Sequence, residues 1–180
     1  GGGGGGGGGA GGGGWGVRGG VGGGGGCGGV VVVGWGEGAA GVSTTALLLG
    51  MGGPGACVVV EADCSGGSLA IELGVSCDPG LVTLAAARRP IDRSLLEEHS
   101  VQVSELCRLV CAPGSGELAA TTVGLTAARL AGFAHGVDVL VDAGRLPPLS
   151  ALRQVVARAQ EVLVLQRRRV SDPTAVVLCP

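Results

Sequence analysis

The chain has 180 residues, and 23 of its first 29 are glycine, so about 150 residues remain to build a core. The formal net charge is −2, with one Phe, two Trp and no Tyr. This composition argues against a basic protein that coats nucleic acid or anionic membranes, and against aromatic platforms for stacking bases. No apolar stretch approaches the roughly 20 residues of a membrane-spanning helix. We therefore expect a cytoplasmic protein with no membrane segment and no direct nucleic-acid signal.

The positions of glycine and cysteine indicate the domain organisation and argue against one kind of metal site. The glycines of residues 1–29 predict a disordered leader, which leaves residues 30–180 as the structured domain. All twelve basic residues are Arg, as a GC-rich gene would produce. The seven cysteines include no CxxC pair, which argues against a zinc site. Cys57 and Cys111 lie in apolar, strand-like runs, where a thiol acts as a small hydrophobic side chain.

Short apolar runs alternate with helical patterns from Val30 onward, which is typical of parallel βαβ units. The first half predicts a strand over Val30–Val33, a Gly-rich turn over Gly34–Gly41, a helix over Ser43–Leu49, a strand over Cys57–Glu61 and a helix over Ser68–Leu73. The second half predicts a helix over Gly80–Arg88, a helix capped by Asp92 and running through Glu98, a strand over Leu106–Cys111, a helix over Glu117–Phe133, a strand over Val137–Val141, a helix from Ser150 to about Ala159 and a strand over Val162–Leu165. Together they predict an α/β fold: a three-layer, doubly wound, mostly parallel sheet of about five strands.

The Gly-rich turn lies between a buried strand and a helix, where main-chain N–H groups and the helix dipole attract anions. Residues 36–43, GEGAAGVS, fit the P-loop pattern G-x-x-x-x-G-K-[ST] at Gly36, Gly41 and Ser43. Val42 occupies the position of the lysine that reaches the phosphates. Ser43 is placed to contact Mg²⁺, and Thr44 is placed to add a phosphate contact.

The same turn fits a second pattern, the dinucleotide fingerprint G-x-G-x-x-G followed by an acidic residue at the end of the next strand. Gly36, Gly38 and Gly41 match it, and Glu61 lies 25 residues after Gly36. This pattern predicts a Rossmann-type oxidoreductase. A third interpretation gives the glycines no ligand at all, only a tight connection between strand and helix.

Segments after the turn favour the P-loop interpretation. Residues 61–67, EADCSGG, resemble the D-x-D-P-x-G stretch of MinD/ParA ATPases, and APGSGELAA resembles the loop after their third strand. VDVLVDAGRLPPLSA resembles their Walker B strand and the following loop. The resemblance spans about Val30 to Leu165 and includes a branch whose turn already carries valine at the lysine position.

This resemblance implies a P-loop NTPase-like domain with ATP and Mg²⁺ as cofactors. It implies that Asp63 and Asp142 are catalytic, and that Ser43, Asp63 and Asp142 hold the Mg²⁺ ion. The implied nucleotide-binding residues are Gly36, Glu37, Gly38, Gly41, Val42, Ser43 and Thr44. It also implies a homodimer, a protein cargo or adaptor, and further strands beyond the fifth, so the domain over residues 30–180 is expected to be truncated.

Two departures from the family pattern concern charge. Val42 replaces the P-loop lysine, and Glu37 stands where the family carries a second, signature lysine. Weak or absent ATP hydrolysis is therefore expected, with Arg145 as a candidate substitute cation. The sequence leaves three hypotheses: an ATP-dependent switch in chromosome partitioning or cellular positioning, a pseudo-ATPase scaffold that binds partners, and a dinucleotide-binding oxidoreductase.

Overall fold

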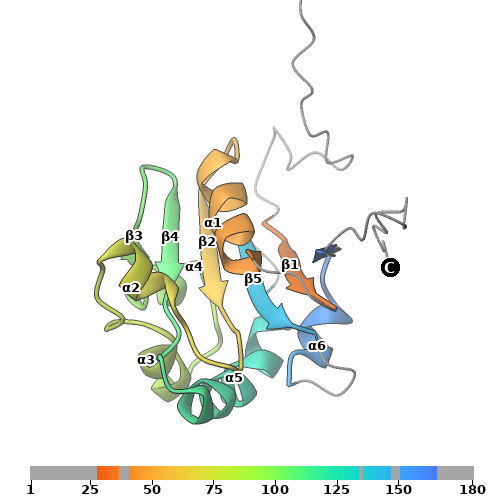
Figure 1. Ribbon diagram of the computed structural model, residues 1–180. Helices are drawn as coiled ribbons and strands as arrows, with labels where there is room; N and C mark the ends of the chain where they lie inside the picture. Colours follow the sequence, from red (N-terminus) through yellow and green to blue (C-terminus); the bar gives the residue numbers. More distant parts are fainter. Residues whose placement is uncertain (1–27, 37–40, 134–135, 147–150, 166–180) are drawn as a thin grey trace, which may run out of the picture.

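A computed structural model describes residues 28–36, 41–133, 136–146 and 151–165 (Figure 1). Its strands are β1 (Val30–Trp35), β2 (Cys57–Glu61), β3 (Val101–Gln102), β4 (Cys107–Val110), β5 (Asp138–Arg145) and β6 (Glu161–Leu165). Its helices are α1 (Val42–Gly52), α2 (Leu69–Leu73), α3 (Leu81–Ala86), α4 (Arg93–Glu98), α5 (Gly116–Leu130) and α6 (Arg153–Val156). Of the predicted leader, Gly28 and Gly29 belong to the described residues, and Gly29 O accepts a hydrogen bond from Val139 N at 2.8 Å.

The six strands form one sheet in the order β3-β4-β2-β5-β1-β6. All neighbouring pairs are parallel except β3 and β4, which are antiparallel. The chain leaves β1 through α1 towards β2, whereas it leaves β5 through α6 in the opposite direction, towards β6. Doubly wound sheets bind ligands outside the carboxyl ends of their strands at such a reversal, here the ends of β1 and β5.

Helices cover both faces of the sheet, which confirms the predicted three-layer, doubly wound α/β fold. One face packs against α3, α4, α5 and α6, and Figure 1 shows α3 and α5 side by side. Its core includes Val32, Val58 and Val141 from the central strands. The other face packs against α1 and α2. The central strands are rich in valine because each has both faces covered.

Helix α1 approaches the sheet closely because it carries a glycine at the contact. A Cβ atom at Gly50 would lie 2.7 Å from Val59 Cγ2 and 3.1 Å from Cys107 Sγ. Cys107 pairs with Cys57 across β4 and β2, beneath the same helix. Burial is the main cause that raises the pKa of Cys57 to about 12, so this thiol stays neutral. Cys57 is therefore a small hydrophobic core residue, as its sequence context predicted.

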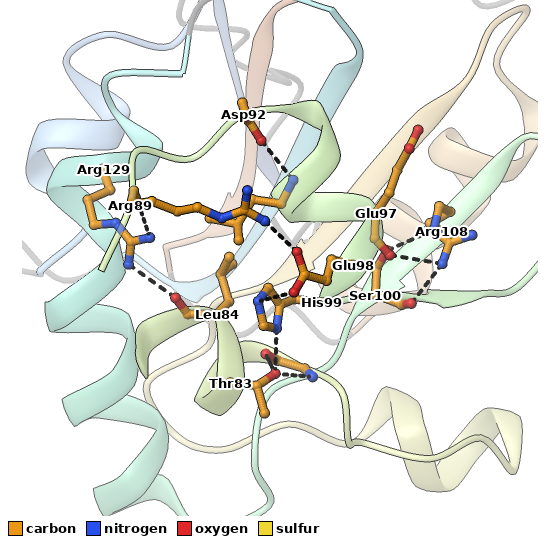
Figure 2. A network of polar contacts seen from close by, with 12 residues as sticks. Thr83, Leu84, Arg89, Asp92, Glu97, Glu98, His99, Ser100, Arg108 and Arg129 are labelled. Atoms are coloured by element: carbon orange, nitrogen blue, oxygen red, sulfur yellow. Dashed lines mark hydrogen bonds and ion pairs between the residues drawn. The ribbon is translucent and has the colours of Figure 1, made fainter. Parts of the chain in front are cut away.

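A polar network joins α3, α4 and the start of β4 (Figure 2). The Arg108 guanidinium donates hydrogen bonds to Glu97 O at 3.1 Å and to Ser100 O at 2.8 Å. His99 Nδ1 lies 2.8 Å from Thr83 Oγ1. These groups satisfy one another and the ends of α4, so the network stabilises the fold rather than presenting a site.

Several elements differ from the sequence prediction, and three of these differences concern β3, β5 and α6. Strand β3 was not predicted, because two residues are too few to show an alternating pattern. Strand β5 continues past Val141 to Arg145, so Asp142 lies inside the strand and pairs with Val33 and Glu61. Helix α6 covers only four residues, and the predicted cap Ser150 lies outside the described residues. No helix in the described part is both long and apolar enough to cross a membrane.

Candidate functional site

The Gly-rich turn enters α1 through a glycine in a left-handed conformation. Gly41 has φ 93° and ψ 18°, a conformation that side chains with a Cβ rarely adopt, and it forms the N-cap of α1. No side chain caps this helix, and its first turn contains no acidic residue. Its first N–H groups are therefore free of capping side chains, as an anion site requires. Glu37 and Gly38 lie outside the described residues, whereas Gly36 directly follows β1.

Val42 packs into the core rather than lining the turn. Its side chain is 4% exposed and belongs to the cluster between α1 and the sheet, together with Val33 and Val59. Only its main-chain N–H, in the first turn of α1, remains for a ligand. Thr44 is exposed on that turn, and Ser43 is half-buried.

Asp142 places a carboxylate beneath the first turn of α1. The residue is fully buried, and its Oδ1 accepts a hydrogen bond from Gly144 N at 3.0 Å. Its Oδ2 is buried without a hydrogen-bond partner among the described residues. Burial raises the pKa of Asp142 to about 6, and the charges of Glu61 and Asp63 add to this, while the nearby Ser43 hydroxyl and the Gly144 N–H oppose it.

Asp63 follows β2 and lies beside the end of β5. Its Oδ1 accepts a hydrogen bond from Ser65 N at 2.7 Å, which fixes the turn after the strand. A side chain at Gly144 would overlap the Asp63 carboxylate, and Gly144 also has a left-handed φ of 55°. Glycine at 144 therefore allows β5 to approach Asp63. The fold thus brings Ser43, Asp63 and Asp142 close to one another.

Glu61 has a structural role. Its Oε1 accepts hydrogen bonds from Ser68 N at 2.8 Å and Leu69 N at 3.0 Å, and its Oε2 accepts one from Ala112 N at 2.9 Å. The residue is 1% exposed. Both carboxylate oxygens thus hold the start of α2 and the end of β4 in place. Glu61 is not available to a ribose, which removes the acidic residue that the dinucleotide interpretation requires.

Trp35, which ends β1 immediately before Gly36, was not among the site residues predicted from the sequence. The Arg145 guanidinium carbon lies 5.4 Å from the centroid of the Trp35 ring, a cation–π distance. The two residues are partners across β1 and β5, after an irregularity between Val33 and Trp35. Trp35 was predicted to lie inside the Gly-rich turn, whereas the structure places it in β1, and its residue type alone does not indicate a partner.

The side chains at the carboxyl ends of the strands suit a magnesium ion that also binds water or phosphate. They do not suit a metal whose ligands all come from the protein. Ser43, Asp63 and Asp142 offer hydroxyl and carboxylate oxygens, which Mg²⁺ prefers, and the unpartnered Asp142 Oδ2 is suited to a cation or its bound water. Within the described ranges, no group of three or more His, Cys, Asp or Glu could hold a metal ion. An ion here needs further ligands, such as water or phosphate oxygens.

Comparison with solved structures shows an overall likeness to a ParA family ATPase. The chain is similar to the crystal structure of a ParA family ATPase from Chlorobium tepidum TLS, with a TM-score of 0.57 and 19% sequence identity. The alignment covers 76% of this chain but only 59% of that one, so the chain spans less than two thirds of its length. No protein-family model and no curated protein sequence matches the chain. The chain thus has a ParA-like α/β fold.

Proposed function

We propose that the protein binds ATP together with Mg²⁺ at the carboxyl ends of β1, β2 and β5. The observation that carries this proposal is the position of Asp142 Oδ2 beside the first turn of α1, an 11-residue helix that no side chain caps. This buried oxygen has no hydrogen-bond partner among the described residues. Leaving such an oxygen unpaired costs roughly 1–3 kcal/mol or more, which a bound cation would offset. An anion-binding helix end next to a cation-binding carboxylate suits a magnesium–phosphate ligand.

Each described residue of the site has a distinct part in this proposal. The main-chain N–H groups that follow Gly41 bind phosphate oxygens, and Thr44 extends the same turn. The Ser43 hydroxyl and Asp142 hold the ion, and Asp63 orients a water bound to it. Mg²⁺, when bound, supplies positive charge that neutralises the phosphates.

Val42 makes efficient hydrolysis of ATP by this site alone unfavourable. A buried valine provides no charge for a transferring phosphoryl group, which the lysine of a P-loop would supply. We therefore propose a ParA/MinD-like nucleotide-dependent switch with weak turnover, which forms a homodimer and positions a protein cargo or an adaptor. Chromosome partitioning and other cellular positioning remain the processes that the sequence resemblance suggests.

The buried Val42 also favours a second candidate function, a pseudo-ATPase scaffold that keeps the fold to bind partners without turnover. Phosphate release by the full chain separates the two. Turnover that disappears in Asp142→Asn removes the scaffold hypothesis. Nucleotide binding without turnover and without a change in oligomeric state favours it over the switch.

The direct test is calorimetry of the full chain with Mg²⁺-ATP, beside Asp142→Asn and the matched control Asp138→Asn. Asp138 begins the same strand at its opposite end, where its Oδ1 accepts a hydrogen bond from Gly29 N at 3.3 Å. We expect micromolar binding by the wild type, a loss of about tenfold or more in Asp142→Asn, and a change within about twofold in Asp138→Asn. A folded wild type that binds no Mg²⁺-ATP would refute the proposal.

A further inference from the structure

The site described above contains more negative than positive charge. Asp142 lies close enough to Glu61 and Asp63 for both carboxylates to raise its pKa, after the larger effect of burial. The position that carries lysine in the P-loop pattern holds a buried valine. A triphosphate brings further negative charge, so its binding calls for a cation from the chain in addition to Mg²⁺.

Arg145 is the basic side chain that the structure places between the ends of β1 and β5. It is the last residue of β5 and is exposed, and its Cα partner on β1 is Trp35. The main chain fixes this arrangement as well, because Leu146 N donates a hydrogen bond to Trp35 O at 3.0 Å. Trp35 directly precedes Gly36, so the guanidinium over its ring lies where the Gly-rich turn begins.

The contact with the Trp35 ring leaves Arg145 suited to bind phosphate. A cation–π contact acts on the charge of the guanidinium and does not use any of its five N–H donors in a hydrogen bond. Among the described residues, no carboxylate forms an ion pair with Arg145. A side chain held by an aromatic ring also loses less conformational freedom when a ligand binds.

We propose that Arg145, held over the Trp35 ring, is the phosphate-binding cation of this site and takes the place of the lysine that Val42 replaces. Arg145 contacts the phosphates, and Trp35 is a positioning residue that acts through it. The inference rests on the proposed function, because it needs a nucleotide at the edge formed by β1 and β5. It goes further by naming the residue that supplies charge from the chain.

Calorimetry of the full chain with Mg²⁺-ATP tests the role of Arg145 through three variants. Arg145→Ala is expected to weaken binding by about tenfold or more, and Arg145→Lys by less, since lysine keeps the charge but loses the planar donor set. The matched control is Arg158→Ala. Arg158 is exposed and follows α6 near the start of β6. It therefore lies towards the amino ends of the parallel strands, away from the site at their carboxyl ends, and affinity is expected to change by less than about twofold.

A double-mutant cycle tests the role of Trp35. Trp35→Leu is expected to weaken binding several-fold in the wild type and to have little effect once Arg145 is alanine. Equal effects of Trp35→Leu in both backgrounds would show that the ring does not act through Arg145. Circular dichroism of each variant establishes that it is folded.

The outcomes separate this inference from the proposed function. Binding by the wild type with an unchanged affinity in Arg145→Ala would overturn the role of Arg145 and leave nucleotide binding intact. Absence of Mg²⁺-ATP binding by the folded wild type would overturn both. A loss in Arg145→Ala matched by an equal loss in Arg158→Ala would reduce the effect to overall charge and also overturn the inference.

Discussion

At the scale of single residues, Asp142 and Glu61 are both buried acids on the same face of neighbouring strands, yet they have opposite roles. Glu61 has both oxygens bonded to main-chain N–H groups, whereas Asp142 has one oxygen bonded and one without a described partner. The number of satisfied oxygens therefore distinguishes a structural acid from a candidate ligand-binding acid.

This contrast explains which site residues the sequence could reveal. Ser43 was predicted from the P-loop pattern, and Asp63 and Asp142 from the resemblance to MinD/ParA ATPases, because both rest on residue types at fixed spacings. The structural role of Glu61 was not predictable, since an acid at a strand end gives the same pattern whether it binds a ligand or a main-chain amide. The pairing of Trp35 with Arg145 depends on a local irregularity of β1, which has no sequence signal.

A pH-dependent stability follows from Asp142 in the metal-free protein. Its pKa is raised to about 6, so the folded state holds the proton more tightly than the unfolded chain does. The contribution of this group to stability is greatest below pH about 4 and is lost as pH rises through about 6. Because a shift of one pKa unit corresponds to about 1.4 kcal/mol, the loss amounts to about 3 kcal/mol.

Asp142→Asn removes the charge and should remove this dependence. Urea unfolding in the presence of EDTA, at several pH values between about 4.5 and 8, measures it. Above pH about 7 we expect the variant to be more stable than the wild type by about 1–3 kcal/mol, because it buries no charge at this position. The new amide N–H₂ has no hydrogen-bond acceptor among the described residues, which offsets part of this gain. Parallel stability curves for the two proteins would contradict the pKa of Asp142.

At the scale of elements, the contact of α1 with the sheet determines where its first turn lies relative to β5. Gly50 makes this contact, beneath which lie Val59 and Cys107. The sequence predicted the helix but ended it at Leu49, because a cluster of glycines usually indicates a break. Here the helix continues to Gly52, since packing on the sheet offsets the low helix propensity of glycine.

Two glycines of α1 offer a matched comparison. Gly50→Ala is expected to destabilise the protein by about 1–2 kcal/mol, because a Cβ there lies only 2.7 Å from a methyl group of Val59. Gly52→Ala meets no atom within 4 Å and is expected to be neutral or to stabilise by up to about 1 kcal/mol. Thermal unfolding of both variants measures the difference. A Gly50→Ala protein as stable as Gly52→Ala would mean that α1 sits further from the sheet.

The remaining elements show which strands and helices the hydrophobic pattern of the sequence can predict. Five strands and the helices between them were predicted, because parallel strands buried on both faces are continuous apolar runs. Strand β3 was missed because it has two residues, and the end of β5 was misplaced because Asp142 is polar although it stays in the sheet. The prediction ended the strand before Asp142 because this side chain is polar, whereas main-chain pairing continues β5 to Arg145.

At the scale of the whole molecule, the site depends on one sheet that joins distant parts of the sequence. Ser43, Asp63 and Asp142 come from α1, the loop after β2, and β5, and the sheet order places these segments side by side. The alternation of strands and helices predicted the fold class, but not this order, which depends on tertiary packing and the handedness of crossovers. Ligand binding at the site should therefore stabilise the domain as a unit.

The measurement that tests the central claim most directly is hydrogen–deuterium exchange of the full chain, with Mg²⁺ alone and with saturating Mg²⁺-ATP. Exchange is expected to slow in peptides that cover residues 41–45 and 142–146, relative to Mg²⁺ alone, because the nucleotide and ion would hold the first turn of α1 and the end of β5. Slower exchange confined to other segments, or no change at saturating Mg²⁺-ATP, would contradict a nucleotide site at this edge of the sheet.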